Sequence, residues 1–322
     1  MSPPLLPSRN APFPPSPPLH PLPPPPPPPP GSARADALRR RRRGIADFLF
    51  VTPTWVFMLA VGLIPAIYAL WMSLTNSALI GGTGEFVGLQ NYIRAVFTPK
   101  FLGSLGVTLL FVVLGLMIQF FVGYLLAVAL HRQLRGFRIA RTVLLVPMLL
   151  TPVVVGLMWN FMFNPDLGVI GAFVRLFGPA VNFFADPFLA IGVIVLLDSW
   201  MFVPFVMLMM VAGMTGVPEE VREASALDGA SWWQATRYVI LPILRPVITV
   251  TLIVRCVDIV RLFDTIYTTT KGGPGTSTTT VSLLSYATTF SFYEFGQGAA
   301  MAIALTIVMF PVYFLYIRMT RV

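Results

Sequence analysis

The chain has 322 residues, of which 56% are hydrophobic and only 11% are charged, and its net charge is +9. Soluble domains are about one quarter charged, so this composition is typical of an integral membrane protein. The arginines that make the chain basic gather beside the ends of apolar stretches, which argues against a nucleic-acid surface. The single cysteine, Cys256, excludes an internal disulfide and a cysteine metal cluster.

Residues 1–44 are rich in proline and end in a block of arginines, Arg39 to Arg43. Such a segment cannot bury a hydrophobic core, so we expect a disordered cytoplasmic tail. The unbroken run from Pro23 to Pro30 fits a ligand for a proline-recognising domain, a solvated tail or a start codon placed too far upstream, and we favour the last two. The apolar stretch that follows is too long for a signal peptide and should remain as a membrane anchor.

Residues 45–322 are predicted to form one all-α integral membrane domain with six transmembrane helices. A helix needs about 20 apolar residues to cross a bilayer. Six stretches meet this length, at about 48–75, 104–130, 142–163, 187–213, 246–267 and 297–317. Residues 167–184 are also apolar, but Arg175 and the pair Gly178-Pro179 interrupt them. We therefore expect these residues to form an interfacial segment outside the membrane and not a seventh helix.

The distribution of arginines predicts how the six helices are oriented. They are concentrated in the N-terminal tail, the loop after the second helix, the loop after the fourth helix and the C-terminus. The alternate loops contain only a few basic residues. Both termini and the loop at about 214–245 are therefore expected in the cytoplasm.

The loop at about 214–245 is predicted to contain two short helices joined at a glycine. Pro218 and the glutamates after it suit a helix start. Gly229 can adopt the left-handed conformation that ends a helix. Ser231 and Gln234 have the spacing of a capping box for the second helix.

Pro242 and Pro246 are expected to limit that second helix before the fifth membrane helix begins. The aromatic residues of the loop could simply anchor it at the membrane interface. Anchoring does not require two capped helices around a glycine, however. A pre-shaped helical corner on the cytoplasmic side is better explained by docking into a groove of another protein.

The loop sequence EASALDGASWWQATRYVILP, Glu223 to Pro242, resembles the EAA loop of ATP-binding-cassette (ABC) importer permeases, E-A-A-x-x-x-G-x(9)-I-x-L-P. Ser225 replaces the usual third-position alanine, which is a change between small residues. In that family the loop forms the coupling helix that seats in the ATP-binding subunit. The resemblance implies a coupling role for Glu223, Ala224, Ser225, Asp228, Gly229, Ala230, Ile240, Leu241 and Pro242.

Two further segments resemble carbohydrate permeases of the maltose-permease type: RLFDTIYTTTKGGPGTST from Arg261 to Thr278, and FVGLQNY from Phe86 to Tyr92. The resemblance covers about residues 48–320 and implies the six-helix type I ABC importer permease fold. It also implies the partners: a second homologous permease subunit, two ATPase subunits that bind ATP and Mg²⁺, and an extracytoplasmic solute-binding protein. The expected location is the bacterial cytoplasmic membrane, with multiple passes through its lipid.

The sequence contains no residues that could hydrolyse ATP. The phosphate-binding string G-x-x-x-x-G-K-[S/T] is absent, and GGPG at Gly272 to Gly275 is better interpreted as a turn outside the membrane. The two histidines, His20 and His131, lie far apart at the tail and at a helix end, which argues against a metal or acid–base site. We therefore expect a protein that is not an enzyme and holds no cofactor or metal of its own.

Charged residues within membrane helices are costly and point to a transport pathway or to helix pairing. The fifth predicted helix contains Arg255, Asp258, Arg261 and Asp264 at intervals of three. The charges either neutralise one another and fix helix packing, or line a hydrated path in which they bind sugar hydroxyls. The candidate path residues are Asp198, Trp200, Asp258, Arg261, Asp264 and Tyr267, with Trp159 and Asn160 as weaker candidates.

These observations predict a transmembrane permease subunit of an ABC importer that moves a carbohydrate or polyol by alternating access. An ion- or proton-coupled secondary transporter remains an alternative, with the row from Arg255 to Asp264 as its relay. That alternative leaves the capped cytoplasmic loop unexplained. A membrane-embedded enzyme is the third possibility, and the two isolated histidines disfavour it.

Overall fold

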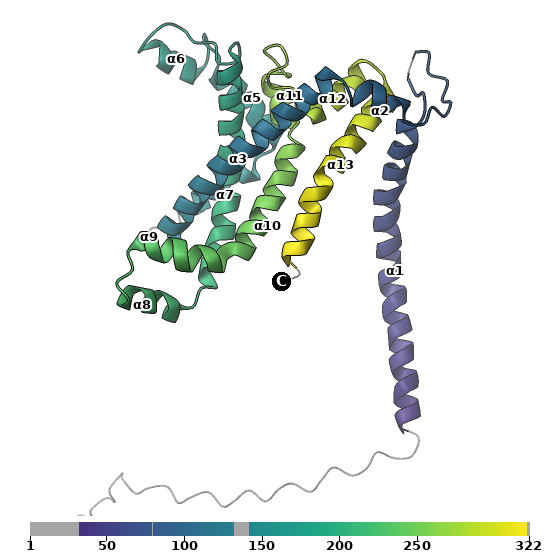
Figure 1. Cartoon of the computed structure of the whole chain (residues 1–322), viewed down its shortest axis with the longest axis vertical. Coiled ribbons are helices and arrows are strands. Elements are labelled where there is room, and N and C mark those ends of the chain that lie inside the picture. The colour runs from purple at the N-terminus through teal and green to yellow at the C-terminus, as the bar shows by residue number, and fades with distance from the viewer. Residues whose placement is uncertain (1–31, 79, 132–141, 321–322) are drawn as a thin grey trace, which may run out of the picture. The chain divides into compact units, whose positions relative to one another are not determined.

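A computed structural model describes residues 32–78, 80–131 and 142–320, and its regular structure is helical apart from an isolated bridge between Thr75 and Phe86. The chain divides into two units, residues 1–63 and 64–322. Helix α1 (Ser32–Ser73) crosses that boundary, and the remaining helices belong to the second unit (Figure 1). The expected disordered tail falls mostly on residues 1–31, outside the described residues. The arginine block Arg39 to Arg43 lies within α1, in a segment of strong helix formers.

The second unit is a succession of long helices joined by short ones. Its first half contains α2 (Gln90–Ala95), α3 (Pro99–His131), the 3₁₀-helix η1 (Val146–Leu149), α5 (Pro152–Met162), α6 (Val169–Arg175) and α7 (Pro187–Thr215). Its second half contains α8 (Glu219–Leu227), α9 (Trp232–Gln234), the π-helix η2 (Ala235–Ile240) and α10 (Leu241–Val260). It ends with α11 (Asp264–Thr269), α12 (Val281–Tyr286), the π-helix η3 (Ala287–Ser291) and α13 (Phe295–Thr320).

Four described helices are long and apolar enough to cross a membrane: Val51–Ser73, Pro99–Leu130, Pro187–Thr215 and Ala235–Val260. They correspond to the first, second, fourth and fifth predicted spans. The sixth predicted span, 297–317, coincides with a shorter apolar helix, Phe295–Pro311, at the start of α13. As expected, residues 167–184 do not form a seventh span, because their helix α6 has only 7 residues.

The third predicted span, 142–163, is not one continuous helix. Thr142–Leu149 and Pro152–Met162 are bent by 99° relative to each other. Thr151 between them is extended, with φ −71° and ψ 130°, because the residue before a proline is disfavoured in the helical region. Pro152 then starts α5, where its missing N–H is not required. Counting the bent pair as one span brings the number of candidate spans among the described residues to 5.

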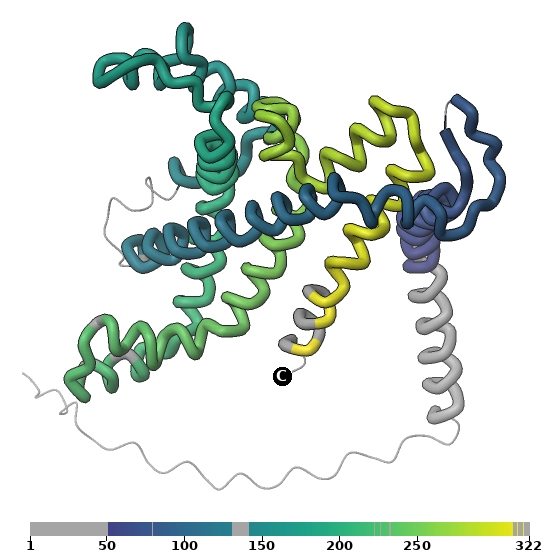
Figure 2. The backbone as a smooth tube through the Cα atoms, turned by 45° about the horizontal axis from the view of Figure 1, so that its top comes forward, coloured from purple at the N-terminus to yellow at the C-terminus, as the bar shows by residue number. Residues whose placement is uncertain are grey.

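Helix α7 lies at the centre of the second unit. Its side chains contribute to all three hydrophobic clusters, and 61% of its most apolar window is buried, against 28% for α3. Helix α3 packs along α7 (Figures 1 and 2). Gly123 permits this close approach, since a Cβ at that position would lie 2.8 Å from the Cβ of Val206.

Many apolar side chains of α3 remain exposed. Leu109, Val113 and Phe121 of α3 are examples, with 50%, 53% and 65% of their surface accessible. A soluble monomer rarely exposes a large apolar surface. The pattern is that of helices surrounded by lipid or by another membrane subunit.

Candidate functional site

The loop predicted at about 214–245 forms a helical corner, which Figure 2 shows as two helical segments folded back on each other at one end of α10. Helix α8 has Glu219 and Glu220 in its first turn, where carboxylates complement the positive end of the helix. Beyond α8, Gly229 has φ +72°, so its predicted left-handed conformation is confirmed. The N–H of Ala230 donates to the carbonyl of Ser225 at 3.1 Å, which is the bond of a Schellman helix end.

The start of the second helix of the corner carries the predicted capping box. The Ser231 hydroxyl accepts from the Gln234 N–H at 3.3 Å, and the Gln234 amide oxygen accepts from the Ser231 N–H at 2.8 Å. Each side chain thus satisfies a backbone donor that the helix cannot pair internally. Together with Gly229, this pair fixes the angle at which the two helices meet.

The expectation that Pro242 and Pro246 limit the second helix is wrong. The chain continues from α9 through the π-helix η2 into α10, so the second helix of the corner and the fifth span form one unbroken helical segment, called the rod below, which is bent in Figure 1. Pro242 lies in the first turn of α10, where α-helical bonding restarts after the π-helix and a missing N–H is tolerated. Pro246 lies inside α10.

The structure separates the nine coupling candidates into two groups. Six lie at the corner, where Glu223, Ala224 and Asp228 are exposed. Ser225, Asp228, Gly229 and Ala230 also line a cavity of about 350 Å³, together with Gln234, Tyr238 and Val239. Ile240, Leu241 and Pro242 lie apart, at the junction of η2 and α10, and Ile240 packs against the hydrophobic cluster around Met207 and Met210.

A buried polar network joins the three long helices α3, α7 and α10. The Arg255 guanidinium donates to Asp198 Oδ2 at 3.0 Å and to Gln119 Oε1 at 2.9 Å, while Gln119 Nε2 donates to the same Asp198 oxygen at 2.7 Å. The side chains of Arg255 and Asp198 are 1% and 6% exposed. The guanidinium also lies 3.8 Å from the centre of the Phe202 ring, a favourable cation–π position.

Asp198 is therefore enclosed between helices and engaged by two partners. Sequence reasoning identified Asp198 and Arg255, but it missed Gln119 and Phe202. Gln119 was visible as an isolated amide in the apolar run of α3, although nothing in the sequence said which helix it would face. Nothing in the sequence distinguished Phe202 from the many other aromatic residues of the chain as a partner of Arg255.

The charge row proposed for the fifth helix does not lie on one helix. Arg255 and Asp258 belong to α10 and pair at 3.2 Å, and Arg261 reaches Asp258 at 3.5 Å from the end of that helix. Asp264 instead begins α11. The predicted span therefore ends near Val260, not at residue 267.

Hydroxyl groups compensate for this early helix end. Thr280 donates to the carbonyl of Leu262 at 3.0 Å, and Ser282 donates to the carbonyl of Val260 at 3.2 Å. These bonds provide partners for two carbonyls at the end of α10, so the helix can end there without leaving them unpaired.

An aromatic cluster lies beside the end of α10. Phe263 stacks on Tyr267 at 5.2 Å and contacts Tyr286 at 4.8 Å, and Tyr286 lies 5.1 Å from Phe290. Hydrogen bonding to Tyr267 raises the pKa of the Tyr286 phenol above its ordinary value. Tyr267 is 40% exposed, and the neighbouring side chains of Asp258 and Arg261 are 41% and 70% exposed.

The remaining candidate path residues are less exposed to solvent. Trp159 is 9% exposed and contacts the ring of Trp200 at 6.0 Å, while Trp200 itself is 38% exposed. Asn160 donates to the carbonyl of Thr269 at 2.7 Å and thereby ties α5 to α11. Within the described residues no group of three or more His, Cys, Asp or Glu side chains could hold a metal ion.

Comparison with known families gives one match over most of the second unit. Residues 119–322 match the family described as "Binding-protein-dependent transport system inner membrane component". The matched region includes the corner, the buried polar network and the aromatic cluster.

Several curated proteins are similar over nearly their whole length. The trehalose/maltose transport system permease protein MalF of Thermococcus litoralis is 30% identical over 284 residues, which cover 87% of this chain and 95% of the relative. The trehalose transport system permease protein SugA of Mycobacterium tuberculosis is 32% identical, covering 84% and 87%. The sn-glycerol-3-phosphate transport system permease protein UgpA of Rhizobium meliloti is 33% identical, covering 81% and 89%.

A solved structure shares the fold. A chain of a bacterial ABC transporter involved in the import of the acidic polysaccharide alginate superposes with a TM-score of 0.77, covering 89% of this chain and 98% of that one. The sequence identity of 19% limits this likeness to the arrangement of the helices.

Proposed function

Because the chain belongs to the family of binding-protein-dependent transport system inner membrane components, we propose that it is one permease subunit of an ABC importer for carbohydrates or polyols. The long, 30%-identical match to a trehalose/maltose permease supports this solute class. The similarity to a glycerol-phosphate permease widens it to related polyol phosphates.

The proposed assembly places this chain in the bacterial cytoplasmic membrane with both termini in the cytoplasm. It contains a second, homologous permease, two ATPase subunits that bind ATP and Mg²⁺, and an extracytoplasmic solute-binding protein. The arginine distribution supports the orientation. The apolar surfaces left exposed on α3 suit contact with lipid or with the second permease.

In the proposed mechanism the corner from Glu223 to Ala230 transmits movement of the ATPase subunits. Closure of the ATPases on ATP displaces the corner, and the continuous rod of η2 and α10 carries the displacement into the membrane. Rocking of the two permeases then opens the central path first outward and then inward. A rigid corner is required because a flexible loop would absorb the displacement.

The proposed solute path uses the exposed groups at the end of α10 and the start of α11. Asp258, Arg261 and Asp264 offer charged hydrogen-bonding groups, and Tyr267 offers an aromatic face for a sugar ring. Trp200 is partly exposed and can contribute from α7. Asp198 has its carboxylate occupied by Arg255 and Gln119, so we assign it to helix packing.

The observation that carries the proposal is the geometry of the corner. A left-handed glycine, a Schellman bond and a reciprocal capping box hold two exposed helices at a fixed angle around a cavity. Such a pre-formed knob fits a groove on a partner. A secondary transporter needs no such partner, and its proposed relay is interrupted where α10 ends before Asp264.

The experiment that tests this function is solute uptake by proteoliposomes that contain the complete complex. Radiolabelled trehalose, maltose and glycerol 3-phosphate are offered with loaded binding protein, with ATP inside the vesicles or without it. We expect uptake of one of these solutes that requires ATP and is unaffected by a proton ionophore. Uptake that persists without ATP and collapses with the ionophore would instead identify a secondary transporter.

A further inference from the structure

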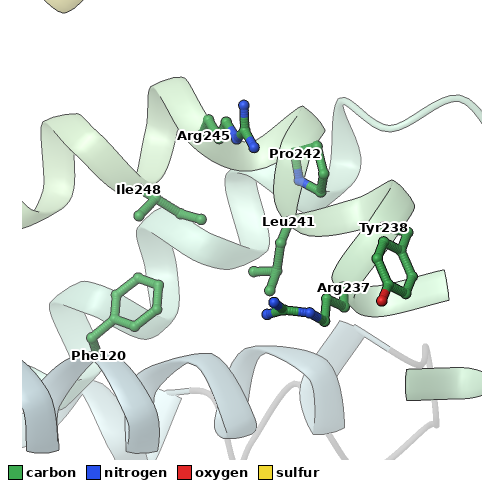
Figure 3. Close-up of a pocket in the computed structure, with 7 residues that line it drawn as sticks. All are labelled: Phe120, Arg237, Tyr238, Leu241, Pro242, Arg245 and Ile248. Atoms are coloured by element: carbon green, nitrogen blue, oxygen red, sulfur yellow. The ribbon is translucent and has the colours of Figure 1, made fainter. Parts of the chain in front are cut away.

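A second cavity, of about 460 Å³, lies between α3 and the rod formed by η2 and α10. Its lining residues are Phe120, Arg237, Tyr238, Leu241, Pro242, Arg245 and Ile248 (Figure 3). Only Leu241 and Pro242 belong to the nine coupling candidates, and none of the lining residues belongs to the proposed solute path.

The lining of the cavity combines charged and apolar side chains. Arg237 and Arg245 supply two positive charges, and no acidic residue lines the cavity. Neither arginine forms an ion pair with another residue in the described part of the chain, and both are exposed. Two guanidinium groups without a carboxylate partner favour an anion, and phosphate esters suit their geometry.

The rod supplies the cavity with one face. Arg237, Leu241, Arg245 and Ile248 follow one another at intervals of four, four and three residues, which places them on one side of a helix. Figure 3 shows Phe120 facing this row from α3, with the Arg237 guanidinium below Leu241. Charged and apolar side chains alternate along the row, with Leu241 between the two arginines and Ile248 three residues beyond Arg245.

Part of the cavity wall belongs to a candidate membrane span, Ala235–Val260. The apolar side chains on this wall suit an acyl chain better than a water-soluble partner, while the arginine stems can extend towards an aqueous surface.

We propose that this cavity binds an anionic phospholipid, with the headgroup phosphate at Arg237 and Arg245 and an acyl chain along Phe120 and Ile248. A free phosphate ester offers the same anionic chemistry but would leave the apolar side chains of the cavity uncovered. The bound lipid would stabilise the junction between the corner and the membrane-spanning part of α10.

Native mass spectrometry of the full-length chain in mild detergent tests this site. Phosphatidylglycerol and phosphatidylcholine with identical acyl chains are added to delipidated protein, and sn-glycerol 3-phosphate serves as the soluble anion. We expect phosphatidylglycerol to bind preferentially. Arg237→Gln and Arg245→Gln should each weaken its binding about fivefold, because one basic residue near an anionic surface contributes about 1 kcal/mol.

Two further variants make the result specific. Ile248→Trp narrows the cavity and should weaken phosphatidylglycerol binding even though both arginines remain. Arg318→Gln removes an exposed arginine near the end of α13, outside the cavity, and should leave binding unchanged. Equal binding of the two lipids, unchanged binding in the glutamine variants, or equally tight binding of glycerol 3-phosphate would each overturn the proposal.

Discussion

Gly229→Pro is expected to abolish ATP-driven uptake while the subunit still reaches the membrane. Proline fixes φ near about −65° and cannot adopt the +72° of Gly229, so the Schellman end of α8 cannot form. No atom lies within 4 Å of a Cβ built at this position, so the effect is conformational and not steric. The measurement is uptake and ATPase activity of the reconstituted complex, with membrane insertion checked by immunoblot.

A series of glycine substitutions distinguishes a specific role of the corner from a general loss of folding or membrane insertion. Gly229→Ala should retain part of the activity, because a left-handed alanine costs about 1–2 kcal/mol. Gly81 has the same φ of +72° with no atom within 4 Å, in a loop far from the corner in sequence. Gly81→Pro should therefore leave uptake intact. Equal loss of uptake in Gly81→Pro and Gly229→Pro would show that the corner has no special role.

Arg255→Met is expected to lower the free energy of unfolding by about 3–5 kcal/mol, because it leaves the buried carboxylate of Asp198 without its cation. Asp198→Leu should cost less, since Arg255 keeps Asp258 at 3.2 Å and Gln119 at 2.9 Å. The double variant removes both charges and should be more stable than Arg255→Met alone. Unfolding in mixed micelles with increasing SDS provides the measurement.

The double-mutant cycle isolates the contribution of the pair. Asp264→Asn is the matched control, because Asp264 is exposed and should change stability by less than about 0.5 kcal/mol. If Asp264 lines the solute path, the same variant should still reduce uptake. Additive losses in the double variant would mean that Arg255 and Asp198 do not stabilise each other, and the packing role would have to be abandoned.

The parts of the corner that were predicted correctly depend on short-range rules. Gly229, Ser231 and Gln234 lie within six residues, and helix-end bonding alone determines their conformation. The apolar spans were found for a similar reason, since membrane thickness sets helix length directly.

The errors arose where backbone bonding depends on distant residues. The rod through Pro242 depends on a π-helix, and the end of α10 depends on hydroxyls of Thr280 and Ser282 about twenty residues away. The partners of Arg255 lie on α3 and α7. Helical periodicity does not reveal such contacts, so the sequence alone could not separate packing charges from exposed ones.

We infer that this chain couples transport of the solute to ATP hydrolysis in separate subunits. The most direct test of this coupling is the ATPase rate of the complete complex in proteoliposomes, measured with empty and with solute-loaded binding protein. We predict that the loaded binding protein stimulates hydrolysis and that Gly229→Pro removes the stimulation. An ATPase rate that is the same with empty binding protein, loaded binding protein and the Gly229→Pro complex would contradict the claim.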